Sequence, residues 1–428
     1  VLYLPPIHPI GRANRKGPNN TLDAKLTDPG SPWAIGAAEG GHDAIHPDLG
    51  NLADFEGFVA EAAKHGIEIA LDLALQCSPD HPWVTAHPEW FTTLPDGTIA
   101  YAENPPKKYQ DIYPLNFDND YEGLRAEIHR IVELWISRGV SIFRVDNPHT
   151  KPVHFWEWLI GEVNAKHPEV IFLAEAFTRP AMMHTLAAVG FQQSYTYFTW
   201  RNHKRELADY FTEVSQHTSA FFRPNFFVNT PDILTEYLQF GGVPAYKIRA
   251  ALAAMAAPAW GMYAGFELIE NVARPGSEEN IDNEKYEYKF RDFAGALKVG
   301  RSIAPYISRL NSIRRAHPAL QQLRNLRIHH TDDDAILAFS KFLPAHLTGT
   351  GKPHGVIVIV NTDPHAVRET MVRLDLSLLG LPHEASFTAT DLISGSTYTW
   401  TKDTFVRLDS FSEPVHIISV GYGKVTAK

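Results

Sequence analysis

Three short apolar runs, each followed by an acidic residue, constrain the fold of this chain more than any other feature. The runs and their acids are residues 141–145 with Asp146, 170–174 with Glu175, and 225–229 with Asp232. Runs of this length and composition are typical of buried parallel strands. In a (β/α) barrel the carboxyl ends of the strands open on one face, where active sites lie. The pattern therefore predicts a (β/α) barrel with an acidic active site.

Strand-like and helix-like runs alternate over most of the chain, as they do in parallel α/β folds. We count seven strands, one fewer than a closed eight-stranded barrel needs. Residues 76–120 lack periodicity, and a stretch of that length indicates a functional loop or subdomain. From residue 323 the sequence pattern changes to short β-type runs separated by polar turns, which predicts an antiparallel β-sandwich. The expected domains are a catalytic barrel over residues 1–322, with residues 76–120 inserted, and a C-terminal β-sandwich over residues 323–428.

Composition excludes several classes of partner. The 428 residues carry a net charge of −10 and contain no apolar run long enough to span a bilayer, so we expect neither a nucleic-acid nor a membrane partner. The single cysteine, Cys77, permits no intrachain disulfide, and we expect a small buried side chain there. The histidines show no metal-ligand spacing with acidic partners, so we expect no metal and no cofactor. We expect a cytoplasmic location, and the sequence leaves open whether two copies form a homodimer.

Four segments resemble, in order, the sequence regions of the α-amylase family of glycoside hydrolases and transferases. They are residues 71–77, 139–146, 174–175 and 227–232. The resemblance implies an α-amylase-type TIM barrel in which Asp146 is the nucleophile, Glu175 the general acid and base, and Asp232 a ligand of sugar hydroxyls. Arg144, two residues before Asp146 and so on the same strand face, would keep that carboxylate ionised.

Two departures narrow the resemblance. Most hydrolytic members of the family have Asn-His after the Asp of the first region and Asn-His-Asp in the fourth, where this chain has Gln76-Cys77 and Thr230-Pro231-Asp232. A subfamily of maltosyltransferases that use maltose 1-phosphate shows the same departures, and residues 103–117 resemble that subfamily closely. Because Gln76 replaces a calcium-ligand Asn, we expect no calcium there. The resemblance also implies that an N-terminal domain and the first barrel strand are missing, which would account for a count of seven.

The same resemblance indicates which residues contact the substrate. A dianionic phosphate leaving group needs hydrogen-bond donors and positive charge. The candidates are Asn104, Lys107, Tyr109 and Asn147, whereas we expect Lys108 to be solvated. Lys16, Lys285 and Tyr286 resemble the family's ligands for the second glucose ring, and Gln76 is counted with them as substrate-binding.

The resemblance implies a retaining glycosyltransferase. It would move maltosyl units from α-maltose 1-phosphate to the non-reducing end of an α-1,4-glucan and release phosphate. One alternative is an α-glucan hydrolase or transglycosylase with a non-phosphorylated donor, against which the donor-rich segment 104–109 counts. A remote alternative is an amylase-fold binding protein without catalysis, against which the intact set of three acids counts.

Overall fold

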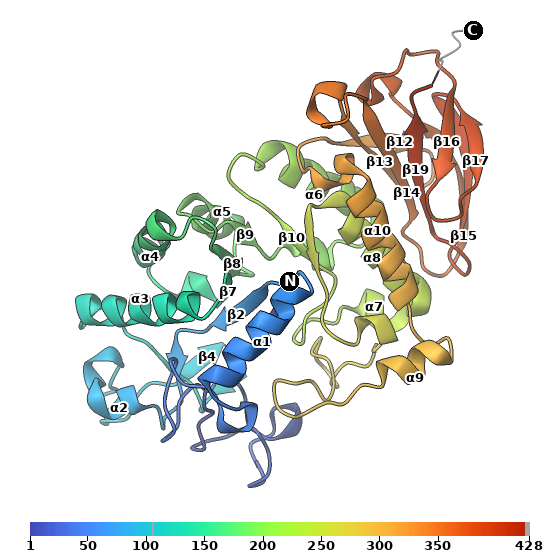
Figure 1. Cartoon of the computed structure of the whole chain (residues 1–428). Helices are drawn as coiled ribbons and strands as arrows, with labels where there is room; N and C mark the ends of the chain where they lie inside the picture. The colour runs from blue at the N-terminus through green and yellow to red at the C-terminus, as the bar shows by residue number, and fades with distance from the viewer. Residues whose placement is uncertain (105–106, 424–428) are drawn as a thin grey trace. The chain divides into compact units, whose positions relative to one another are not determined.

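The computed structural model describes residues 1–104 and 107–423, without the side chain of Asn104. It divides into two compact units (Figure 1). The first contains Val1–Tyr195 and Ile281–Phe290, and the second contains Thr196–Asn280 and Arg291–Lys428. No helix in the described ranges is long and apolar enough to cross a membrane.

A five-stranded parallel sheet, in the order β1-β2-β7-β8-β9, forms the centre of the first unit (Figure 1). Its strands are β1 (Leu2–Leu4), β2 (Ile69–Leu73), β7 (Ile142–Asp146), β8 (Ile171–Glu175) and β9 (Gln193–Ser194). Every residue of β2 and β7 is buried, as in parallel sheets that are covered on both faces. The carboxyl ends of β7 and β8 deliver Asp146 and Glu175.

Helices follow the strands of this sheet. The longer ones are α1 (Leu52–Lys64), α3 (Tyr121–Ser137), α4 (Val153–Lys166) and α5 (Pro180–Ala188). Helix α1 starts at a capping box in which Asn51 and Asp54 each accept the other's backbone N–H. Helix α3 buries Leu124, Ile128 and Trp135 on one face, the spacing expected for an amphipathic helix. Short 3-10 turns are η1 (Pro18–Asn20), η2 (Pro47–Leu49) and η4 (Pro148–Thr150).

The segment predicted as a long insertion contains secondary structure of its own. Its elements are β3 (Gln76–Cys77), α2 (Pro82–Ala86), η3 (Pro88–Trp90), β4 (Ala102–Asn104), β5 (Lys107–Tyr109) and β6 (Tyr113–Pro114). Strand β3 pairs with β6, and β4 with β5, both antiparallel. The segment therefore contains short helices and two short antiparallel strand pairs, and its assignment as an inserted loop or subdomain stays a prediction.

The second unit begins with helices around one parallel strand pair, β10 (Asn225–Phe227) and β11 (Ala259–Gly261). Its helices are α6 (Lys204–Thr212), which continues into the π-helix η6 (Glu213–His217), α7 (Glu236–Phe240), α8 (Gly242–Ala256), α9 (Phe293–Lys298) and α10 (Ala304–Ala316). Short turns are η5 (Tyr197–Trp200), η7 (Phe266–Leu268) and η8 (Pro318–Gln321). Together with the five strands of the first unit, β10 and β11 give the seven parallel strands that the sequence predicted within the described residues.

An eight-stranded antiparallel sheet closes the chain (Figure 1, orange to red). Its strands are β12 (Leu326–Thr331), β13 (Ile336–Leu343), β14 (His354–Asn361), β15 (Val367–Arg373), β16 (Phe387–Asp391), β17 (Thr397–Trp400), β18 (Asp403–Asp409) and β19 (Val415–Gly421), with η9 (Ala345–Leu347) and η10 (Leu376–Leu379) between them. Strand β12 pairs with β13 through its first residues and with β15 through its last two. A strand that changes partner in this way makes the corner between two packed layers. The expected boundary between residues 322 and 323 stays a prediction.

Candidate active site

Asp146 and Glu175 are register partners at the ends of β7 and β8. The backbones of register partners on neighbouring parallel strands lie roughly 5 Å apart across the sheet, and their side chains point to the same face. Apart from Arg144 both strands are apolar up to these last residues, so burial of the strands fixes the position of the two carboxyl groups. The structure thus brings together the two acids that the sequence singled out.

One guanidinium, that of Arg144, connects the two acids. Its Nη1 donates to Asp146 Oδ1 at 2.8 Å and to Asp72 Oδ2 at 2.7 Å, and its Nη2 lies 3.5 Å from Glu175 Oε1. Burial opposes the charge of Arg144, but the surrounding carboxylates hold its pKa well above the usual value. Arg144 is therefore a permanent cation at the centre of the acid cluster.

Asp72 and Tyr3 belong to this cluster, although no role was predicted for them. Tyr3 donates its hydroxyl to Asp72 Oδ2 at 2.6 Å. Burial raises the pKa of Asp72 to about 7, against the lowering effect of Arg144. A signal was available in the sequence, because Asp72 is the only charged residue of the apolar strand β2. An acid in such a strand indicates a buried partner.

A third residue without a predicted role is Lys151, which follows η4. Its Nζ donates to Thr150 Oγ1 at 2.9 Å, and Thr150 in turn donates to the carbonyl of Asn147 at 2.7 Å. Burial lowers the pKa of Lys151, while Asp146 and Glu175 act in the opposite direction. Lys151 is thus a cation in the electrostatic field of both acids.

Asn147 directly follows Asp146 and has a positive φ of 44°, a conformation that Asn tolerates better than most residues. Its N–H donates to Glu175 Oε2 at 3.3 Å, and its side chain is exposed. The backbone of Asn147 therefore ties the general-acid candidate to the strand that carries the nucleophile candidate.

The predicted sugar-binding residues cluster around Trp33 and Asp111. Lys16 is buried and donates to Gln110 Oε1 at 2.5 Å, and Gln76 donates to the Trp33 carbonyl at 3.3 Å. The Lys285 ammonium lies 5.7 Å from the ring centroids of both Trp33 and Tyr286. Burial raises the pKa of Asp111, and Lys16 and Lys285 both oppose that rise. Four predicted residues, Lys16, Gln76, Lys285 and Tyr286, thus share one polar and aromatic environment.

Two of the predicted phosphate ligands lie on β5. Residues alternate between the faces of a strand, so Lys107 and Tyr109 share one face and Lys108 has the other. Tyr109 packs against the apolar cluster that contains Trp33 and Ala74. Lys108 is exposed and lies 3.5 Å from Glu103. The side chain of Asn104, the remaining loop candidate, falls outside the described part of the chain.

Asp232 belongs to the second unit. It follows β10 in a tight turn in which Thr230 and Ile233 pair, and its N–H donates to Thr230 Oγ1 at 3.2 Å. The N-cap of the next helix, α7, is Thr235. The role of Asp232 as a ligand of sugar hydroxyls stays a prediction.

Comparisons with known proteins identify relatives of similar sequence. A family model described as "GLGE, C-terminal" matches residues 328–420. The α-1,4-glucan:maltose-1-phosphate maltosyltransferase 2 of Streptomyces coelicolor is 59% identical over 421 residues, which are 98% of this chain and 62% of that protein. The enzyme of the same name from Mycobacterium tuberculosis H37Rv is 55% identical over 98% of this chain and 59% of its own length.

Solved structures agree on the fold. A maltogenic α-amylase from Thermotoga neapolitana superposes with a TM-score of 0.71 at 16% identity, over 98% of this chain and 90% of that one. A trehalulose synthase, MutB, gives 0.69 at 14% identity, over 98% and 92%. The fold is that of the α-amylase type, as predicted from the sequence. Within it, the chain is similar in sequence to α-1,4-glucan:maltose-1-phosphate maltosyltransferases, and it spans about three fifths of the length of these relatives.

Proposed function

We propose that the chain carries the catalytic part of a retaining maltosyltransferase. It would transfer maltosyl units from α-maltose 1-phosphate to the non-reducing end of an α-1,4-glucan and release phosphate. The observation that carries the proposal is the pairing of Asp146 with Glu175 at two strand ends, with Arg144 between them. The names of relatives at 55–59% identity supply the donor and the acceptor.

In the first step, a carboxylate oxygen of Asp146 attacks the anomeric carbon of the maltosyl group. The bond from that carbon to the phosphate oxygen breaks, and phosphate leaves with the electron pair. Arg144 engages Oδ1 of Asp146, so we assign the attack to Oδ2. The product is a β-maltosyl ester, the intermediate of a double displacement. Phosphate is a good leaving group and needs little protonation from Glu175.

In the second step, the acceptor 4-hydroxyl attacks the same carbon from the face that phosphate has left. Glu175 takes the hydroxyl proton as general base, and the ester bond to Asp146 breaks. Contacts from Arg144 and the Asn147 N–H hold the two Glu175 oxygens, which orients the group for this transfer. Two inversions give net retention of the α configuration.

The remaining predicted residues would bind the phosphate and the two glucose rings of the donor. Lys107, Tyr109, Asn104 and Asn147 are proposed to hold the phosphate. Lys16, Gln76, Lys285 and Tyr286 are proposed to hold the second glucose ring, and Asp232 to bind hydroxyls of the first. The homodimer and the cytoplasmic location stay predictions.

One assay separates the three functions considered. Maltose 1-phosphate is incubated with maltohexaose, and both phosphate and glucan length are measured. The proposal expects phosphate release coupled to products two glucose units longer. Maltose release without elongation, or turnover of maltohexaose alone, would favour the hydrolase or transglycosylase. No turnover of either compound by the full-length protein would favour a binding protein.

A further inference from the structure

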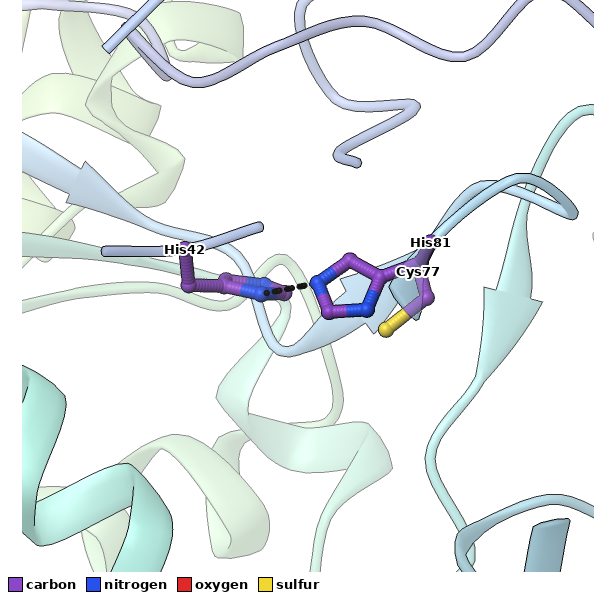
Figure 2. A group of neighbouring side chains, drawn as sticks. All are labelled: His42, Cys77 and His81. Atoms are coloured by element: carbon purple, nitrogen blue, oxygen red, sulfur yellow. Dashed lines mark hydrogen bonds between the residues drawn. The ribbon is translucent and has the colours of Figure 1, made fainter. Parts of the chain in front are cut away.

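Two imidazoles and a thiol that the proposed reaction does not use meet in the interior of the first unit. His42 lies in a loop ahead of η2, Cys77 is in β3, and His81 is the N-cap residue of α2. A nitrogen of each histidine and the Cys77 Sγ all lie within 4.8 Å of one another, and the three side chains are buried (Figure 2). His42 and His81 are 39 residues apart in sequence, so no local spacing indicated the group.

Hydrogen bonds define where the protons of the group are. The Trp83 N–H donates to His81 Nδ1 at 3.0 Å, which places the His81 proton on Nε2. That N–H reaches His42 Nδ1 at 3.1 Å, the contact drawn in Figure 2, and His42 Nε2–H donates to the Ala74 carbonyl at 2.9 Å. Both rings are neutral, because burial lowers the pKa of His42 to about 4 and that of His81 to about 2.

Two features of the group are those of a metal site. Metal-binding imidazoles usually donate their second N–H to a carbonyl or carboxylate, and His42 does so to Ala74 while its Nδ1 lone pair faces the group. Among the described residues, Cys77 Sγ has no hydrogen-bond partner. Two glycines leave the space that the His81 ring occupies. A Cβ on Gly36 would lie 2.2 Å from His81 Cδ2, and one on Gly41 would lie 2.3 Å from His81 Nε2.

We propose that His42, Cys77 and His81 bind a borderline or soft divalent cation such as Zn²⁺. The ligand atoms are His42 Nδ1, Cys77 Sγ and His81 Nε2, and water fills the fourth position of a tetrahedral site. Cys77 gives up its thiol proton to solvent. The His81 proton moves from Nε2 to Nδ1, which changes the tautomer but not the charge. Binding therefore releases one proton per ion.

The tautomer change has a cost that can be compared with the gain. A proton on His81 Nδ1 faces the Trp83 N–H, so the N-cap hydrogen bond of α2 is lost. An N-cap is worth about a fivefold factor in an equilibrium constant, whereas structural zinc sites have dissociation constants of about 50 nM or tighter. Metal binding is therefore more favourable than the N-cap hydrogen bond that it replaces, and the first turn of α2 loosens when the ion binds.

Co²⁺ is a spectroscopic probe for this site. The purified, chelator-treated chain is titrated with Co²⁺, and thiolate-to-metal charge transfer is followed in the near ultraviolet. We expect one equivalent to bind, an affinity that rises about tenfold per pH unit below the thiol pKa because one proton leaves, and displacement by Zn²⁺. Hydrogen exchange at the Trp83 amide should become faster in the loaded protein.

Variants separate this site from other histidines. Cys77→Ser should abolish the charge-transfer band and weaken binding at least about 100-fold, since loss of an outer-sphere partner alone costs 10- to 100-fold. His42→Gln, which keeps the thiol, should weaken binding similarly. His317→Asn is the matched control, because it breaks another partly buried histidine pair, with His354 at 2.9 Å, in which cysteine takes no part.

The decisive result comes from the native sequence and does not depend on the folding of any variant. Absence of a saturable charge-transfer band in the folded chain would overturn the proposal. A band that persists in folded Cys77→Ser, or unchanged protection of the Trp83 amide in the loaded protein, would equally remove the assignment of these three ligands.

Discussion

Lys107→Ala should reveal whether the donor carries a phosphate. Lys107 is a half-buried residue of β5 and shares a strand face with Tyr109. The backbone of Lys107 pairs with Asn104 in the β4–β5 hairpin, so truncation to Ala removes the ammonium and leaves the ladder in place. The proposed function assigns this ammonium to the leaving phosphate.

The size of the effect follows from the type of contact. A hydrogen bond to a charged group contributes about 1.5–3 kcal/mol, so its loss should reduce kcat/KM for maltose 1-phosphate about 10- to 150-fold. Maltosyl fluoride has a leaving group that needs no cationic partner, and its kcat/KM should change far less. Lys108→Ala is the matched control from the opposite strand face. Its pair with Glu103 is exposed, and exposed pairs contribute little because solvent and salt screen them.

The assay measures phosphate and fluoride release at a fixed concentration of maltohexaose. The reasoning is supported if Lys107→Ala discriminates between the donors and Lys108→Ala does not. Equal losses with both donors would mean that Lys107 only supports the hairpin. In that case the phosphate-donor proposal would lose its main support at the level of single residues.

Four other outcomes are expected. Asp146→Ala should abolish transfer, and Glu175→Ala with maltosyl fluoride should leave a maltosyl adduct that peptide mass spectrometry finds on Asp146; an adduct on Asp232 would overturn the assignment. A crystal structure should show the Asp146 and Glu175 carboxyl groups roughly 5–5.5 Å apart, and a separation near 9 Å would indicate inversion. Adding Ca²⁺ to chelator-treated protein should not change phosphate release, because Gln76 stands where a calcium ligand is expected; activation by Ca²⁺ would contradict this. Asp72 binds its proton more tightly in the native state, with a pKa of about 7 against 3.8, so it should lower the free energy of unfolding as pH rises from about 4 to 7. The difference between native and Asp72→Asn unfolding energies, measured by denaturant titration, should show this slope, and a flat difference would refute it.

Local patterns were sufficient for the barrel-type part of the fold. The apolar residues of Tyr121–Ser137 have helical spacing in the sequence, and this segment is helix α3. The acids Asp146 and Glu175 were found because they directly follow apolar runs. Four strands of the C-terminal sheet were missed, among them β15 (Val367–Arg373) and β18 (Asp403–Asp409). In β15 and β18 buried residues alternate with more exposed ones over most of the strand, and a search for continuous apolar runs overlooks that pattern.

Contacts between distant segments could not be derived from the sequence. Arg144 was placed beside Asp146 because they are two positions apart on one strand, whereas the equally close contact of Arg144 with Asp72 spans 72 residues. For the same reason, the sequence did not predict that the side chains of His42, Cys77 and His81 lie close together. Tertiary structure brings such residues together, and only a resemblance to known sequences indicated that Lys16 and Lys285 belong to one site.

The net charge of the acid cluster affects a phosphorylated donor and a neutral donor differently. Three carboxyl groups, those of Asp72, Asp146 and Glu175, outnumber the two cations near them, Arg144 and Lys151. The raised pKa of Asp72 reduces this excess of negative charge. A unit negative charge 6 Å from a phosphate charge costs about 3 kcal/mol at an effective dielectric constant of 20. A neutral glucan meets no such repulsion. A sugar-phosphate donor therefore requires added cations that a neutral donor does not. Substitution of a lysine tests the donor directly, whereas substitution of an acid stops both kinds of reaction.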